Sequence, residues 1–397
     1  MKMRPITYSK NVFVPVTNVC RNKCAYCGFR RNPDHKEAFL VTEEEARTVF
    51  KNGAKTGCTE VLFAFGEYPE EKEGFKTRFQ KQLNDMGFET VIEYTAHLCR
   101  LALDYGLLPH VNGGILSFEE LKMIAPLNAS MGLMLETTAS VLSHKDCPGK
   151  MPAVRLEMIE NAGKLKIPFT TGLLAGIGET RDDWAISLSE INRLHEKYGH
   201  IQEVILQNYT PNSGQEAAAA RQAADRMTGA GQAADRMTAA EQAADRTTAA
   251  GQAADRMTAA GQAADQTTVA GQSADRTTAA FGLKPPTKQD MIDLIIVAKR
   301  ILSPDISIQV APNLISPIEL IQYGVTDLGG ISPVTIDYIN PESAWPEIEN
   351  LKNLLQSKGY EFKERLPIYP KYVKAGFGGK KTLELIEQLS DDGGYRK

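Results

Sequence analysis

Short apolar runs alternate with longer amphipathic segments along most of the chain. The amphipathic segments predict helices, and in the first of them Thr42 and Glu45 have the spacing of a capping box. Many of the apolar runs lack a polar face, which is typical of buried parallel strands. The predicted helices include 42–57, 91–105, 117–127 and 153–166, and the predicted strands are 11–17, 60–66, 107–112, 130–136, 168–176, 203–209, 307–313 and 327–332.

About eight strand-then-helix units of this kind predict an α/β protein with a (β/α) barrel of the TIM type. A doubly wound open sheet is the alternative, because the pattern alone does not prove that the sheet closes. We expect residues 1–216 and 281–397 to form this barrel domain, with a core at about 11–340 and a C-terminal extension at 341–397.

A ten-residue unit, typified by QAADRMTAAG, repeats six times from Gln222 and interrupts this pattern. A helix turns about 100° per residue, so an apolar stripe of period ten drifts around the helix and builds no lasting seam. The units also lack the large apolar face that solenoid repeats bury. We therefore expect 217–280 to be a solvated insertion, partly helical or disordered, and a specific binding array is the alternative.

Composition and charge narrow the classes of function. The chain has 397 residues, 42% of them hydrophobic, and a formal charge of −4, which gives no reason to expect a nucleic-acid partner. No apolar run approaches the roughly 20 residues of a membrane span, and 12–16 is too short for the core of a signal peptide. We expect a cytoplasmic protein, whose six cysteines then favour metal binding or catalysis over disulfides.

Three cysteines, Cys20, Cys24 and Cys27, follow the first predicted strand with the spacing C-x3-C-x2-C. In a barrel this position is the catalytic mouth. A structural zinc site needs four closed ligands, whereas Cys58, Cys99 and Cys147 are scattered and are expected to be inert. Three thiolates suit a 4Fe-4S cluster with one iron open to a small molecule, and zinc or another cluster remains the alternative.

The cysteine motif, with Tyr26 just before its last cysteine, resembles that of the radical S-adenosylmethionine (SAM) superfamily. The resemblance implies that SAM binds at the open iron. It assigns the SAM amino group to Gly66 and Glu67, the SAM carboxylate to Arg155, and a ribose- or amine-facing position to Glu136. The segment GLLAGIGET resembles the one that packs against adenine, through Gly172, Gly176, Ile177 and Glu179.

A finer resemblance, carried by segments such as LFAFGEYPE, LQNYTPNSG and GVTDLGGISPVTIDYINPESAWP, is to the deazaflavin-forming radical SAM enzymes. It implies conversion of a 4-hydroxybenzyl adduct of 5-amino-6-ribitylaminouracil to a deazaflavin, with release of ammonia, methionine and 5'-deoxyadenosine. It also implies a companion subunit that makes the adduct and a low-potential donor such as ferredoxin or flavodoxin. The repeat insertion departs from this family, in which a short loop is expected.

Polar residues at the ends of predicted strands are candidates for substrate contacts, because strand ends face the mouth of a barrel. These candidates are His110, Asn112, Gln207, Asn208 and Asn313. Two other functions stay open. One is a different radical SAM enzyme, either the companion subunit or a relative from the menaquinone pathway. The other is a non-catalytic iron–sulfur or zinc protein that acts as a scaffold through the repeats.

Overall fold

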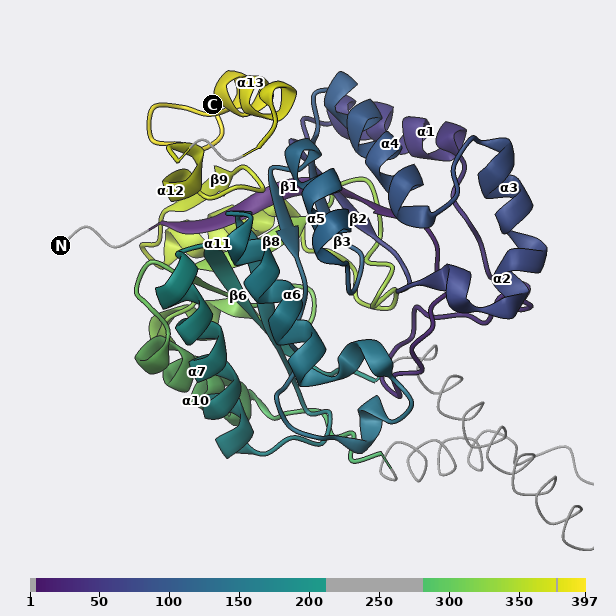
Figure 1. Ribbon diagram of the computed structural model, residues 1–397. Helices are drawn as coiled ribbons and strands as arrows, with labels where there is room; N and C mark the ends of the chain where they lie inside the picture. Colours follow the sequence, from purple (N-terminus) through teal and green to yellow (C-terminus); the bar gives the residue numbers. More distant parts are fainter. Residues whose placement is uncertain (1–4, 212–280, 376–377) are drawn as a thin grey trace, which may run out of the picture.

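Eight parallel strands close into a barrel, as the sequence predicts (Figure 1). The computed structural model describes residues 5–211, 281–375 and 378–397, so the predicted insertion at 217–280 lies outside the described residues. Closure is shown by β1, which pairs in parallel with both β2 and β8. The strands are β1 (Ile6–Pro15), β2 (Glu60–Ala64), β3 (Leu108–Asn112), β4 (Ser130–Gly132), β5 (Phe169–Ala175), β6 (Ile201–Asn208), β7 (Ser307–Gln309) and β8 (Asp327–Ile331).

Helices surround the barrel, and many of them begin with the predicted kind of cap (Figure 1). At Thr42 the predicted capping box with Glu45 is confirmed. The same box, with Asp or Glu as the third residue, starts α4, α5, α7 and α10. The principal helices are α1 (Glu43–Lys55), α4 (Val91–Asp104), α5 (Phe118–Ile124), α6 (Pro152–Lys164), α7 (Arg181–Tyr198) and α10 (Lys288–Ile301), and the short helices α2 (Glu73–Arg78) and α3 (Gln80–Asp85) were not predicted.

Three strands differ most from their predicted bounds. β1 begins at Ile6 rather than at residue 11, because its first residues pair with β8 and with β9 (Phe362–Arg365). The predictions 130–136 and 307–313 are too long, since β4 and β7 each have three residues. Beyond β4 the regular pairing ends, although Glu136 still forms an isolated parallel bridge with Leu173 of β5, and Met134 and Glu136 line a cavity there.

The side chains of β1 show how the barrel is built. Ser9, Asn11 and Phe13 line cavities inside the barrel, whereas Val12 and Val14 belong to the hydrophobic core that packs outside the sheet. This alternation follows from the two-residue repeat of a strand. The apolar core therefore lies between sheet and helices, and the interior of the barrel is free to carry polar groups.

The C-terminal segment covers the end of the barrel opposite to the cysteines. It contains α11 (Ile348–Ser357), β9, α12 (Pro370–Val373) and α13 (Lys380–Leu389). β9 pairs with residues 6–9 of β1, so the predicted extension is joined to the sheet itself. None of the helices in the described part of the chain is long and apolar enough to span a membrane.

Candidate active site

The three clustered cysteines line one cavity at the carboxyl ends of the strands, as predicted. Cys20, Cys24 and Cys27 lie on the loop that follows β1, and the cavity has a volume of about 300 Å³. Its other walls come from the residues that follow β2, β3, β4 and β6. We call this space the outer cavity.

The geometry of the cysteine loop fits an iron–sulfur cluster. The backbone N–H of Glu67 donates to Cys20 Sγ at 3.2 Å, and that of Arg30 donates to Cys27 Sγ at 3.4 Å, as N–H groups do around cluster sulfurs. Gly66 lies so close to this loop that a Cβ would be 1.9 Å from the carbonyl oxygen of Val19. Among the described residues, no three His, Cys, Asp or Glu side chains converge on one metal ion. Three cysteines in the wall of one cavity match a cubane cluster with three irons held by the protein.

Cys147 is closer to the motif than its isolated place in the sequence predicts. It is buried, its Sγ accepts a hydrogen bond from the backbone N–H of Lys23 at 3.3 Å, and it hydrogen-bonds to Cys24. This hydrogen bond outweighs burial and lowers the pKa of Cys24 to about 7. Cys58 and Cys99 are buried elsewhere, in the hydrophobic core.

Arg155 of α6 lines the outer cavity and has an unsatisfied donor. Its side chain is 3% exposed, and its Nη1 donates to the carbonyl oxygen of Met134. Its Nε is buried and has no hydrogen-bond partner among the described residues. A buried guanidinium with a spare N–H is suited to a carboxylate, the group that the resemblance places there.

Glu136 also lines the outer cavity, where it forms an ion pair that the sequence did not predict. Lys150 Nζ lies 2.5 Å from Glu136 Oε1 and 5.7 Å from the ring centre of Tyr26. Burial disfavours the charged carboxylate, but Lys150 and Arg155 together lower the pKa of Glu136 below its usual value. Lys150 lies in a short turn outside any motif, so only the fold brings it to the site.

Glu67 faces the same cavity, but its carboxylate is already engaged. Oε1 accepts from Arg21 Nε at 2.9 Å, and Oε2 accepts from the backbone N–H of Ile115 at 3.1 Å. These contacts fix the loop after β2 beside the cysteines. A contact between Glu67 and the SAM amino group stays a prediction.

Leu174 of the glycine-rich segment lines the outer cavity, but the four residues predicted to contact adenine do not. Gly172 permits close contact of β5 and β6, because a Cβ there would be 2.2 Å from the carbonyl oxygen of Ile205. The carboxylate of Glu179 accepts from the backbone N–H groups of Gly176 at 2.7 Å and Ile177 at 2.8 Å. These contacts shape the turn, and the contact of the four residues with adenine stays a prediction.

A second cavity of about 180 Å³ lies deeper in the barrel, and we call it the inner cavity. It shares Phe13, Asn112 and Gln207 with the outer cavity. The five predicted substrate residues all line one or both cavities: His110, Asn112, Gln207 and Asn313 the inner one, and Asn112, Gln207 and Asn208 the outer one.

The residues of the inner cavity that sequence reasoning missed include Asn11, Glu60 and Trp345. Asn11 and Glu60 each directly precede the apolar run of a strand. A polar side chain in such a strand is the signal that could have revealed them. Trp345 comes from the segment after β8 and carries no such signal.

Comparison with known proteins identifies the family. Residues 14–191 match the model of the radical SAM superfamily. The chain is 46% identical over 392 residues to the 7,8-didemethyl-8-hydroxy-5-deazariboflavin synthase of Methanosarcina mazei, covering 99% of this chain and 96% of that protein. It is 39% identical to the enzyme of the same name from Archaeoglobus fulgidus, with both chains covered in full.

Solved structures agree on the fold. The crystal structure of HydG, a maturase of the [FeFe]-hydrogenase, superposes with a TM-score of 0.61 at 15% identity, covering 98% of this chain and 70% of that one. Methylornithine synthase (PylB) gives a TM-score of 0.55 at 14% identity, covering 90% and 83%. From the sequence relatives and the cysteine-lined barrel mouth together, the chain belongs to the 7,8-didemethyl-8-hydroxy-5-deazariboflavin synthase family of radical SAM enzymes.

Proposed function

We propose that the protein is a lyase that converts 5-amino-5-(4-hydroxybenzyl)-6-(D-ribitylimino)-5,6-dihydrouracil, the adduct, to 7,8-didemethyl-8-hydroxy-5-deazariboflavin (FO). Ammonia, methionine and 5'-deoxyadenosine are the other products. One observation carries the proposal: the three cysteines and Arg155, with its spare N–H, line an outer cavity that shares wall residues with a polar inner cavity.

The cofactors of this family are a 4Fe-4S cluster and SAM, and the outer cavity has residues suited to both. Cys20, Cys24 and Cys27 would hold the cluster, and Arg155 would pair with the SAM carboxylate. When bound, these cofactors supply a 5'-deoxyadenosyl radical that removes a hydrogen atom from the substrate.

The protein itself orients the reactants. Glu136 and Lys150 form a buried ion pair in the wall of the outer cavity, where they limit the positions open to SAM. Apolar neighbours such as Phe13, Leu62 and Leu133 restrict water around the reacting atoms. The polar groups of the inner cavity would hold the part of the substrate that does not react.

The proposed reaction requires two partner proteins. The adduct has to be supplied, and we assign that step to FO synthase subunit 2, acting stably or transiently. The radical step consumes an electron of low potential, for which ferredoxin or flavodoxin is suited. A reaction that uses these cytoplasmic partners places the protein in the cytoplasm.

Substrate choice tests the proposal. The anaerobically reconstituted protein, given SAM and a strong reductant, should form fluorescent FO from the adduct and should not act on free tyrosine plus the diaminouracil. Turnover of tyrosine without the adduct would assign the chain to the chemistry of the companion subunit. Failure to cleave SAM with either substrate would favour the scaffold alternative.

A further inference from the structure

The inner cavity contains hydrogen-bond acceptors that have no partner. Asn11 Oδ1 and Asn313 Oδ1 are buried, and no described residue donates to them. The orientation of Asn313 is fixed, because its Nδ2 donates to Asp337 Oδ2 at 2.9 Å and to the carbonyl oxygen of Ser343 at 3.2 Å. The indole Nε1 of Trp345 is an unpartnered donor in the same wall. Buried polar groups without a partner are costly, so a ligand that satisfies them gains affinity.

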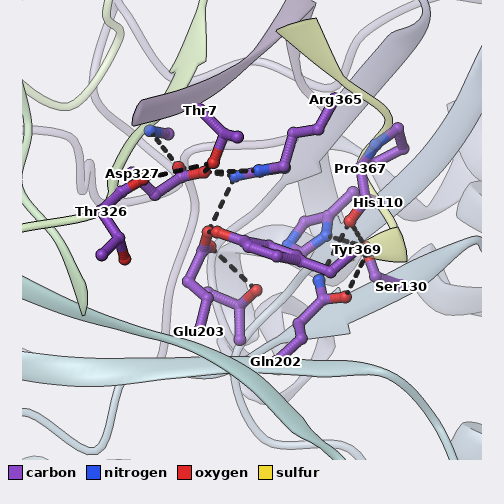
Figure 2. A network of polar contacts seen from close by, with 12 residues as sticks. Thr7, His110, Ser130, Gln202, Glu203, Thr326, Asp327, Arg365, Pro367 and Tyr369 are labelled. Carbon is purple, nitrogen blue, oxygen red and sulfur yellow. Dashed lines mark hydrogen bonds and ion pairs between the residues drawn. The ribbon is translucent and has the colours of Figure 1, made fainter. Parts of the chain in front are cut away.

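His110 adds a further acceptor, and its tautomer is set by a chain of hydrogen bonds. Its Nδ1 lies 2.7 Å from Ser130 Oγ, which lies 2.7 Å from the carbonyl oxygen of Pro367 (Figure 2). A carbonyl oxygen only accepts, so the single hydroxyl proton of Ser130 must point to Pro367. Ser130 Oγ then accepts from His110, and Nδ1 carries the imidazole proton.

The other ring nitrogen, Nε2, is therefore left with a lone pair. His110 is 8% exposed and lines the inner cavity, and no described residue forms a hydrogen bond with its Nε2. Gly132 leaves this edge of the ring clear, since a Cβ there would lie 3.0 Å from Nε2. Burial, with a smaller effect of the Arg365 charge, lowers the pKa of His110 to about 3, so the imidazole stays neutral near pH 7.

We propose that the inner cavity is the subsite for the polyhydroxylated ribityl chain, with His110 Nε2 as a fixed acceptor for one of its hydroxyl groups. This inference rests on the proposed function. A ribityl chain carries several O–H donors in a row, which matches a wall of acceptors. The cysteines line the outer cavity alone, so the reacting benzyl part belongs there and the ribityl chain lies deeper.

Binding of two fluorescent probes tests the subsite. The probes are FO and the same deazaflavin with a methyl group in place of the ribityl chain, titrated against the anaerobic holoenzyme by fluorescence. Wild-type protein should bind FO more tightly than the methyl analogue. His110→Asn keeps a polar group near Ser130 but has none at the Nε2 position, and it should reduce the preference for FO by about tenfold. His110→Gln, which returns an amide to that position, should restore part of it.

His200→Asn is the matched control. His200 is also buried, with its Nε2 2.9 Å from the carbonyl oxygen of Ile159, and it lines neither cavity. Its substitution should leave the preference for FO unchanged. Equal binding of the two probes by wild-type protein, or an unchanged preference in His110→Asn, would overturn the proposal even if FO is formed. Absence of FO formation would instead contradict the proposed function.

Nitrogen chemical shifts give an independent measurement of the tautomer. The chain has six histidines, so protein labelled with 15N-histidine and compared with His110→Asn identifies the His110 signals. The proton should reside on Nδ1 at pH 7.5, and Ser130→Ala should remove this preference. A proton on Nε2 in the wild-type enzyme would make the ring a donor and overturn the assignment.

Discussion

At the scale of single residues, burial and hydrogen bonding decide which side chains are available for chemistry. Glu67 and Glu179 were both predicted to contact SAM, and both already accept hydrogen bonds from the protein. Arg155 keeps a buried N–H without a partner. Arg155 therefore has a donor that a ligand would satisfy, whereas a contact of SAM with Glu67 or Glu179 stays a prediction.

The cysteine assignment predicts iron content. Cys20→Ala, Cys24→Ala and Cys27→Ala should each abolish the absorbance of the reconstituted cluster and the formation of 5'-deoxyadenosine, since each thiolate holds one iron. Cys58→Ala and Cys99→Ala are matched controls from the hydrophobic core and should keep about four irons per chain. Full iron content in Cys24→Ala, or its loss in Cys99→Ala, would refute the motif assignment.

Arg155 should contribute to SAM affinity and not to iron binding. Arg155→Ala should raise the Kd for SAM by an amount equivalent to roughly 2–5 kcal/mol, because a desolvated charge pair loses one partner. Equilibrium dialysis with iron-loaded protein provides the measurement. Arg181→Ala, which removes an exposed arginine paired with Asp290 and Asp293, is the control. Equal Kd values for Arg155→Ala and wild type would remove Arg155 from the SAM site.

The pKa of His110 predicts how the preference for the ribityl chain depends on pH. Protonation would convert Nε2 from an acceptor to a donor, and a pKa of about 3 places this change well below neutral pH. The part of the preference that His110→Asn removes should therefore stay constant between about pH 5.5 and 8.5. Glu203 lines the same cavity, and burial raises its pKa to about 7, so the comparison with His110→Asn separates the two groups. An unperturbed histidine, with a pKa of about 6.5, would lose its part of the preference below that value. A His110-dependent part that falls on acidification through pH 6.5 would show that the ring is not held neutral by burial.

At the scale of secondary-structure elements, Arg365 of β9 links β9 to the strands of the barrel by ion pairs. Arg365 donates to both carboxylate oxygens of Asp327, at 2.7 and 2.8 Å, and to Glu203 Oε2 at 2.8 Å (Figure 2). Thr7 donates to Asp327, and Tyr369 donates to Glu203. The network joins β1, β6, β8 and β9, so the C-terminal segment stabilises the end of the barrel beneath the inner cavity.

Removing this arginine should strongly destabilise the protein. Arg365→Met leaves the buried carboxyl groups of Asp327 and Glu203 without a cation, which should cost about 3–5 kcal/mol of the free energy of unfolding. Lys371→Met removes a cation of the same segment whose ion pair with Asp305 is exposed, and it should have little effect. Urea unfolding followed by circular dichroism gives both values. A loss no larger than that of the control would show that the network does not stabilise the barrel.

The sequence predicted the elements better than their ends. Capping residues such as Thr42 act locally, so the start of α1 was predictable from a few neighbouring residues. The early start of β1 depends on β9, which lies more than 350 residues away in the sequence. The predicted strands 130–136 and 307–313 were too long, because an apolar run does not show where the backbone turns into a cavity.

At the scale of the whole molecule, the barrel holds an outer cavity lined by the cysteines and an inner cavity lined by polar side chains. The cysteines were predictable because the ligands of a cluster lie within eight residues, from Cys20 to Cys27. Cys147 and Lys150 come from one short turn and Trp345 from the segment after β8, and their proximity to the cavities depends on the tertiary fold. In the proposed function the radical would form in the outer cavity and the ribityl chain would bind in the inner one, so the substrate would bind in a single orientation.

Transfer of deuterium from the substrate to 5'-deoxyadenosine tests this orientation of the substrate most directly. Forming the deazaflavin ring converts the benzylic CH2 group of the adduct to a ring CH, so hydrogen must leave that end of the substrate. With adduct deuterated in the 4-hydroxybenzyl group, SAM and reductant, mass spectrometry should find one deuterium in 5'-deoxyadenosine together with FO. Adduct deuterated in the ribityl chain should transfer none. Transfer from the ribityl chain, or 5'-deoxyadenosine without deuterium from the benzyl group, would contradict the placement of the substrate across the two cavities.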